Sequence, residues 1–311
     1  MTALLNVALP VFGIILAGYL AGRAKLLGGH AAEALNLFVF YIALPPLLFL
    51  AMAQTDLNRI FAWDFIAVYG LSMLTLFLIA ALLSRLLFKR TTAEAALAGM
   101  GSIFGNTGYM GIPLTITAFG EDMALPAIIA TVMNSALVVG GVSALVEGAT
   151  RGGQGPWIIA GHVLKSLSRN PLVIGPAAGL IFGALAIPLP APLITFCEIV
   201  GGAAGPCALF AIGLFLVGKP LTASLGEVSV VVALKLLALP ALAFLLLPLF
   251  PGMDSDWARV LLLMTALPLG ANVFVLAMKH DRWILPSSSA TLLSTVLSVA
   301  TVSALLAWMG L

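Results

Sequence analysis

Two asparagines stand among glycines and prolines in strongly apolar parts of this 311-residue sequence. Asn106 lies in "GNTGYMGIPL" (105–114) and Asn272 in "ALPLGANVFVLA" (266–277). A side-chain amide is uncharged yet offers donors and acceptors, so such a pair could bind a carboxylate without adding a buried net charge. The same stretches disfavour regular helix, because glycine costs about 1 kcal/mol and proline about 3 kcal/mol relative to alanine.

The glycines and prolines predict that two helices are interrupted. The predicted interruptions involve Gly105, Gly111 and Pro113 in one helix, and Pro268 and Gly270 in the other. The second half of each helix would begin inside the membrane, with free N–H groups and the positive end of its dipole. Two such ends directed at one point form an anion site. We assign this site to Asn106, Thr107, Gly108, Gly270 and Asn272. The alternative is that these residues serve helix packing, since glycine and proline are common in membrane helices.

Two further polar residues lie within apolar segments. Lys235, in "LKLLALPALAF", could attract an anion electrostatically, pair with another group, or extend its ammonium to the inner surface. Asn134, in "TVMNSALVV", could contact substrate or form a hydrogen bond between helices. The alternatives given for each residue remain open at this point.

The elements that must position these residues are membrane-spanning helices. Hydrophobic residues make up 62% of the chain, charged residues 8%, and the mean hydropathy is +1.17, far from the values of soluble domains. Apolar segments of about 20 residues predict an all-α membrane protein with ten transmembrane helices. They fall near 3–22, 33–53, 62–88, 94–119, 122–147, 171–187, 193–218, 225–250, 256–278 and 286–309.

The distribution of basic residues predicts the orientation. Eleven of the 14 lysines and arginines follow odd-numbered segments, two follow even-numbered ones, and Lys235 lies inside the eighth. The positive-inside rule therefore places both termini on the non-cytoplasmic side. The loop 148–170 would then be a cytoplasmic linker. Trp157, Val163 and Leu167 share a helical face there, which fits either an interfacial helix or a solvated loop.

The linker divides the chain into two five-helix repeats, 1–147 and 171–311. An odd number of helices in each repeat requires that homologous halves be inverted relative to one another. Short matches support the duplication: "PVFG" from Pro10 with "PAAG" from Pro176, and "PPLLF" from Pro45 with "PCALF" from Pro206. The asparagines at 106 and 272 also occupy equivalent segments, the fourth and ninth.

An enzyme is not indicated. No aspartate or glutamate lies in the central third of a segment, and there is no HExxH motif or pair of mid-membrane aspartates. Cys197 and Cys207 suggest packing rather than a disulfide or metal site. We therefore predict no metal, no cofactor and no nucleic-acid partner, and we leave a coupling H⁺ or Na⁺ open.

The stretches "GNTGYMGIPL", "ALPLGANVFVLA", "LNLFVFYIALPPLLF" and "LKLLALPALAF" together resemble the auxin efflux carrier family, which includes bacterial malonate and malate permeases and PIN-type auxin carriers. The resemblance implies ten helices in two inverted repeats, with broken helices four and nine crossing at the substrate site. It implies a scaffold of helices 1, 2, 6 and 7 that forms a homodimer. The transport domain, helices 3–5 and 8–10, would move as an elevator.

By motif, Asn106 and Pro113 match the family's asparagine and proline at the crossing, and Asn134 matches a polar residue near substrate. In PIN-type carriers helix nine has a proline where Val273 aligns, whereas Pro268 and Gly270 stand upstream here. We therefore expect a secondary transporter of a small organic anion in a bacterial cytoplasmic (inner) membrane. The alternative is a channel or passive pore for small anions; an intramembrane enzyme is less supported.

Overall fold

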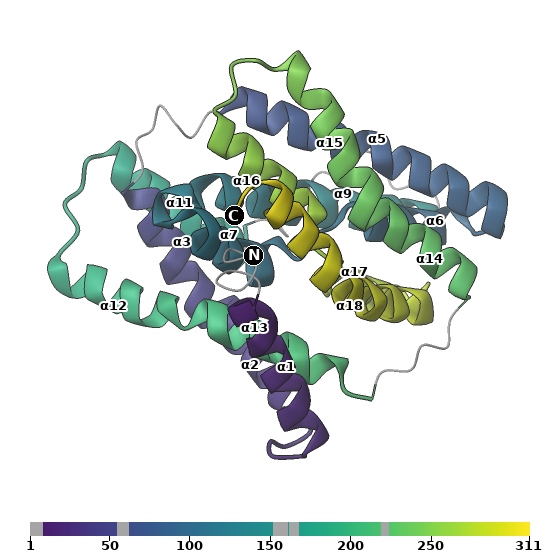
Figure 1. Cartoon of the computed structure of the whole chain (residues 1–311), viewed down its shortest axis with the longest axis horizontal. Coiled ribbons are helices and arrows are strands. Elements are labelled where there is room, and N and C mark those ends of the chain that lie inside the picture. The colour runs from purple at the N-terminus through teal and green to yellow at the C-terminus, as the bar shows by residue number, and fades with distance from the viewer. Residues whose placement is uncertain (1–8, 55–61, 152–160, 162–167, 219–223) are drawn as a thin grey trace.

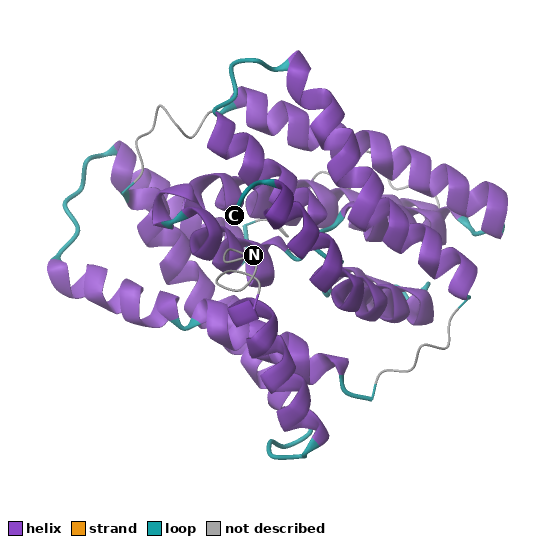
Figure 2. Ribbon diagram, viewed as in Figure 1, coloured by secondary structure: helices purple, strands orange, loops and turns teal. Residues whose placement is uncertain are grey.

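The computed structural model describes the chain except for residues 1–8, 55–61, 152–160, 162–167 and 219–223. All regular elements in the described ranges are helices, as Figures 1 and 2 show, so the all-α prediction is confirmed for this part of the chain. Several helices contain a π-helical turn or a break, and consecutive pieces then follow one another within one apolar segment.

The helices of the first half follow the first five predicted segments. Their bounds are α1 Leu9–Arg23; α2 Ala31–Phe38, η2 Val39–Ala43 and α3 Leu44–Ala53; α5 Trp63–Phe88; α6 Thr92–Ile103, η3 Thr107–Gly111 and α7 Ile112–Phe119; η4 Glu121–Met123, α8 Ala124–Met133, η5 Asn134–Val139 and α9 Gly140–Arg151. Helix α9 thus runs four residues past the predicted repeat boundary at 147. The predicted interfacial helix, apart from Gly161, lies outside the described residues.

The helices of the second half follow the other five predicted segments. Their bounds are α11 Pro171–Ala184; α12 Ala191–Gly202 and α13 Ala204–Leu216; α14 Leu225–Ala233, η6 Leu234–Ala238, α15 Leu239–Leu246 and η7 Leu247–Leu249; α16 Ser255–Ala266 and α17 Asn272–Lys279; α18 Ile284–Trp308.

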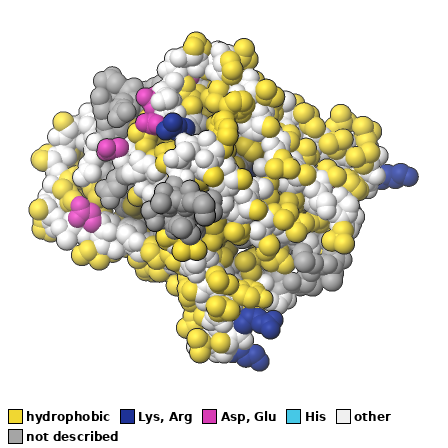
Figure 3. Space-filling view, in the orientation of Figure 1, with side chains coloured by type: hydrophobic (Ala, Val, Ile, Leu, Met, Phe, Trp, Pro, Cys, Tyr) yellow, Lys and Arg dark blue, Asp and Glu magenta, His cyan; other side chains and the backbone are white. Residues whose placement is uncertain are grey.

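Within the described ranges, five continuous helical stretches are long and apolar enough to cross a membrane: Ala31–Ala53, Trp63–Phe88, Ala191–Leu216, Leu225–Leu249 and Ile284–Trp308. The sides of α5 show why such a helix needs lipid. One side buries Phe65, Tyr69 and Met73, whereas the other exposes leucines at 71, 74, 78, 82 and 86. An exposed leucine stripe is stable against hydrocarbon but not against water. Figure 3 shows hydrophobic side chains over most of the visible face, with few charged groups.

Two helix pairs, α1 with α13 and α3 with α11, pack through glycines. A Cβ atom on Gly18 would lie 2.2 Å from the carbonyl oxygen of Phe210, and one on Gly179 would lie 2.2 Å from that of Phe49. Such separations are far below van der Waals contact, so only glycine permits these approaches. Small residues at helix interfaces are the usual means of association in membranes, where helices gain little from leaving lipid.

Candidate functional site

The two predicted breaks lie against each other. Helix α6 ends at Ile103 and α16 at Ala266, and the residues that follow them form an antiparallel bridge between Gly105 and Leu269. The Asn106 N–H donates to the Pro268 carbonyl at 2.8 Å, and the Gly270 N–H donates to the Phe104 carbonyl at 3.1 Å. Each break therefore supplies backbone partners to the other, which satisfies the requirement for paired backbone groups inside a membrane.

Glycines allow this close crossing. A Cβ atom on Gly270 would lie 2.5 Å from the ring of Phe104, and one on Gly111 would lie 2.7 Å from Leu267. Pro113 stands at the start of α7, directly after the π-helical turn η3. The residue types that predicted the interruptions are thus those that the crossing geometry requires.

Two helical N-termini begin at the crossing. The Asn106 carbonyl accepts the amides of Met110 and Gly111, each at 3.1 Å, so a helical turn starts at Asn106. The backbone N–H groups of Thr107 and Gly108 come before the first hydrogen-bonded N–H groups of this turn. They therefore have no acceptor within the helix. Asn272 is the first residue of α17. The side chains of Asn106 and Asn272 are half-buried. Neither side-chain carboxamide makes a hydrogen bond to a described residue.

Asn134 ties the helix that follows to the break in segment four. Its side chain is fully buried, and Nδ2 donates to the Gly105 carbonyl at 3.3 Å and to Thr107 Oγ1 at 3.1 Å. Its Oδ1 is buried and has no partner within the described chain. Asn134 also begins the π-helical turn η5, a feature that is frequent at functional sites. The hydrogen-bonding role proposed from the sequence is therefore present at the crossing.

Lys235 also reaches the crossing. It lies in the π-helical turn η6, its side chain is fully buried, and Nζ donates to the Thr265 carbonyl at 2.6 Å. A Cβ atom on Gly105 would be 3.5 Å from Nζ. The ammonium thus points at the break rather than toward the inner surface, and no ion pair with a carboxylate is found for it among the described residues.

Ser294 binds the backbone at the break in segment nine. This contact was not predicted from the sequence. The Ser294 Oγ accepts the Leu269 N–H at 3.0 Å and donates to the Thr291 carbonyl at 3.0 Å. A signal was available in α18, where buried hydroxyl residues recur at helical spacing: Ser287, Thr291, Ser294 and Ser298. Asn134 and Ser294 therefore have similar roles. Each lies in the transmembrane segment that follows a break, and its side chain forms a hydrogen bond with the non-helical backbone of that break.

A cavity of about 930 Å³ lies beside α7. It lies between α3, α12 and α13 on one side and α7, α8 and α16 on the other. Ile112 and Pro113 form part of its wall, and they follow the helical turn that starts at Asn106. Polar and acidic side chains that also line it are Gln54, Thr117, Asp122 and Glu198.

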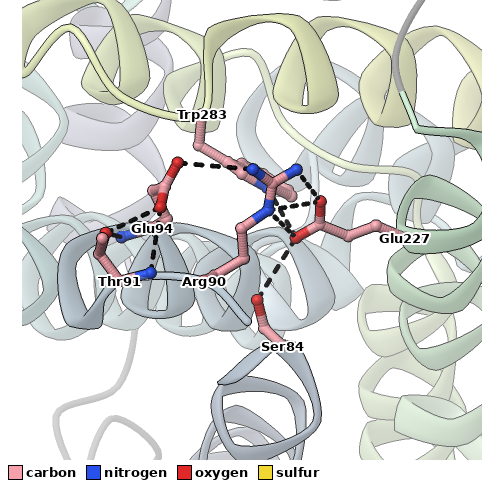
Figure 4. A network of polar contacts seen from close by, with 6 residues as sticks. All are labelled: Ser84, Arg90, Thr91, Glu94, Glu227 and Trp283. Carbon is pink, nitrogen blue, oxygen red and sulfur yellow. Dashed lines mark hydrogen bonds and ion pairs between the residues drawn. The ribbon is translucent and has the colours of Figure 1, made fainter. Parts of the chain in front are cut away.

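A second polar cluster, shown in Figure 4, joins α5, α6, α14 and α18. The Glu227 carboxylate is fully buried and accepts hydrogen bonds from Arg90 Nη2 at 2.6 Å, Trp283 Nε1 at 3.0 Å and Ser84 Oγ at 3.3 Å. The hydrogen bond to Glu227 raises the pKa of Arg90 above its ordinary value. Beside it, Glu94 closes a capping box on the first turn of α6.

The fold and the crossing define a helical membrane protein with a polar site between two broken helices. A family model described as "Membrane transport protein" matches residues 4–306. The chain therefore belongs to this family, the auxin efflux carrier family that its motifs resemble, and is a multi-pass membrane transporter. The prediction that it is not an enzyme is confirmed by this membership.

Curated relatives cover nearly the whole chain. A Rhizobium meliloti (strain 1021) protein described as "Putative malonate transporter" is 32% identical over 98% of this chain and 96% of its own length. The "Uncharacterized transporter YfdV" of Escherichia coli (strain K12) is 26% identical over 88% of this chain and 87% of its own. The "Lysosomal cholesterol signaling protein" of Mus musculus is 25% identical over 96% of this chain but 36% of its own length.

Proposed function

We propose that the protein is a secondary transporter that carries a small organic anion, either a dicarboxylate such as malonate or malate or an auxin-like carboxylate. The observation that carries this proposal is the helical turn that starts at Asn106 in the crossing, where the backbone N–H groups of Thr107 and Gly108 have no acceptor within the helix. The free amides and the dipole at such an end favour an anion. The name of the Rhizobium meliloti relative makes malonate the first substrate to test.

The proposed binding groups are uncharged donors around a positive centre. The Asn106 and Asn272 side chains, half-buried and without partners in the described chain, are free to bind a carboxylate. Thr107 and Gly108 offer backbone amides, and Gly270 allows the two breaks to approach. The Lys235 ammonium, at the crossing, favours anions over cations.

We further propose that 1–147 and 171–311 are inverted five-helix repeats. The two glycine contacts support this, because Gly18 with Phe210 and Gly179 with Phe49 exchange partners at one spacing of 161 residues (18 to 179, 49 to 210). Two equivalent side-chain hydrogen bonds support it too. Asn134 binds the backbone of the break in segment four, and Ser294 binds the backbone of the break in segment nine.

An elevator movement is the proposed route to alternating access. The helices α1, α2, α3, α11, α12 and α13 would form the scaffold, through which a homodimer assembles, and the remaining helices would form the transport domain. The cavity lies between the two sets, where a moving boundary would expose the site. With the termini on the non-cytoplasmic side of an inner membrane, the cavity opens outward, since Gln54, Asp122 and Trp257 lie at outer helix ends.

Uptake of labelled malonate into proteoliposomes tests the function, with malate, lactate and indole-3-acetate as competitors. We expect saturable uptake that Asn106→Ala reduces by about ten-fold or more, since a hydrogen bond to a charged group contributes about 1.5–3 kcal/mol. Asn36→Ala is the matched control, because this half-buried asparagine lies in α2. Absence of carboxylate uptake by folded protein would refute the proposal, and single-channel currents would indicate a pore instead.

A further inference from the structure

The C-terminal ends of two half-helices meet at the crossing, and their chemistry differs from that of the N-terminal ends. The last four carbonyls of an α-helix have no intrahelical donor, and they carry the negative end of the dipole. In transporters with broken helices, such carbonyl ends are where a coupled sodium ion is coordinated. How α6 and α16 satisfy their carbonyl ends therefore bears on cation coupling.

The two carbonyls that directly follow α6 accept hydrogen bonds from uncharged donors of this chain. The Gly270 N–H binds the Phe104 carbonyl at 3.1 Å, and Asn134 Nδ2 binds the Gly105 carbonyl at 3.3 Å. One of the last carbonyls of α16 accepts from a charged donor: Lys235 Nζ donates to the Thr265 carbonyl at 2.6 Å, one residue before the helix ends.

The Lys235 ammonium lies at the carbonyl end of α16. It is fully buried, it touches the carbonyl end of α16, and it lies close to Gly105 in the other break. The π-helical turn η6 carries Lys235, and the side chain extends from segment eight into segment nine. A lysine held in this way keeps a positive charge at the carbonyl end without any bound ion.

We propose that Lys235 is the resident cation of the crossing: its ammonium occupies the position that a coupled sodium ion would need at the end of α16, so that anion transport requires no metal cation. This inference rests on the proposed function and adds the coupling to it. It predicts that removal of the ammonium leaves a vacated position at the Thr265 carbonyl that a small cation can fill.

The transport test compares sodium with N-methylglucamine as the only external cation. Wild-type malonate uptake should be equal in the two media. Lys235→Ala should lower uptake about ten-fold or more in N-methylglucamine, and sodium or n-propylammonium should restore several-fold of the loss. Lys279→Ala is the control, since this lysine is exposed and lies at the far end of α17. A wild-type requirement for sodium, or a fully active Lys235→Ala in sodium-free medium, would overturn the proposal.

A second readout does not depend on transport. Sodium chloride, compared with choline chloride, should raise the unfolding temperature of detergent-solubilised Lys235→Ala but leave wild type unchanged. Lys235→Met, which fills the vacated volume with an uncharged chain, should gain no such stabilisation. A sodium shift in wild type, or none in Lys235→Ala, would count against the proposal even if the substrate were not a carboxylate, so its failure is distinct from that of the proposed function.

Discussion

Breaking the buried ion pair between Arg90 and Glu227 should destabilise the protein. Replacing Arg90 should lower the free energy of unfolding more than replacing Glu227. Glu227 is fully buried, whereas the side chain of Arg90 is 29% exposed. Arg90→Ala leaves a buried carboxylate without its cationic partner, and breaking a buried ion pair in this way costs about 3–5 kcal/mol. Glu227→Ala frees Arg90 to reach water, so its main cost is the unpaired Trp283 N–H, about 1–3 kcal/mol.

Thermal unfolding in detergent measures this difference. At about 2 °C per kcal/mol for a long chain, Arg90→Ala should unfold about 6–10 °C below wild type, and Glu227→Ala should lie between them. The double variant should be less destabilised than the sum of the singles, because each change removes the same interaction. An Arg90→Ala protein as stable as wild type, or additive effects, would refute the reasoning. Arg259→Ala is the matched control, since its ion pair with Asp256 is exposed.

Two more predictions concern packing and the second break. Gly179→Ala should destabilise by about 1–3 kcal/mol, because its Cβ would meet the Phe49 backbone, whereas Gly13→Ala, with open space around it, should not; unfolding temperatures compare the two. Ser294→Ala should lower the free energy of unfolding by about 1–3 kcal/mol, because the buried Leu269 N–H would be left unpaired. Ser298→Ala should lower it less, because the Ser298 hydroxyl binds only its own helix. Equal losses would contradict the role of Ser294 at the break.

The apolar segments were predictable because the bilayer imposes simple rules. Every backbone group must be paired and each span needs about 20 apolar residues, so composition alone marks the helices. The crossing was partly predictable as well, because glycine, proline and asparagine are rarely tolerated together unless a break is required. Asn106 and Pro113 stand out for that reason.

Contacts between distant segments were not predictable from local pattern. Arg90 and Glu227 are separated by 137 residues and look like ordinary charges at segment ends, so nothing in the sequence distinguishes them from solvated groups. Ser294 and Leu269 meet only because α18 packs along the break of segment nine. The direction of Lys235 likewise depends on the π-helical turn η6, which apolar periodicity does not reveal.

The distribution of polar contacts favours movement of one set of helices as a unit. The bonds of Asn134, Ser294, Lys235 and Glu227 all join helices of the proposed transport domain, so none of them must break when that domain shifts. Contacts described across the boundary to the scaffold are weaker or apolar. Pro113 packs on Gly205, and the Tyr109 hydroxyl is 3.4 Å from the Asn36 carbonyl. In the proposed elevator movement, sliding at such a boundary would exchange apolar contacts for similar ones.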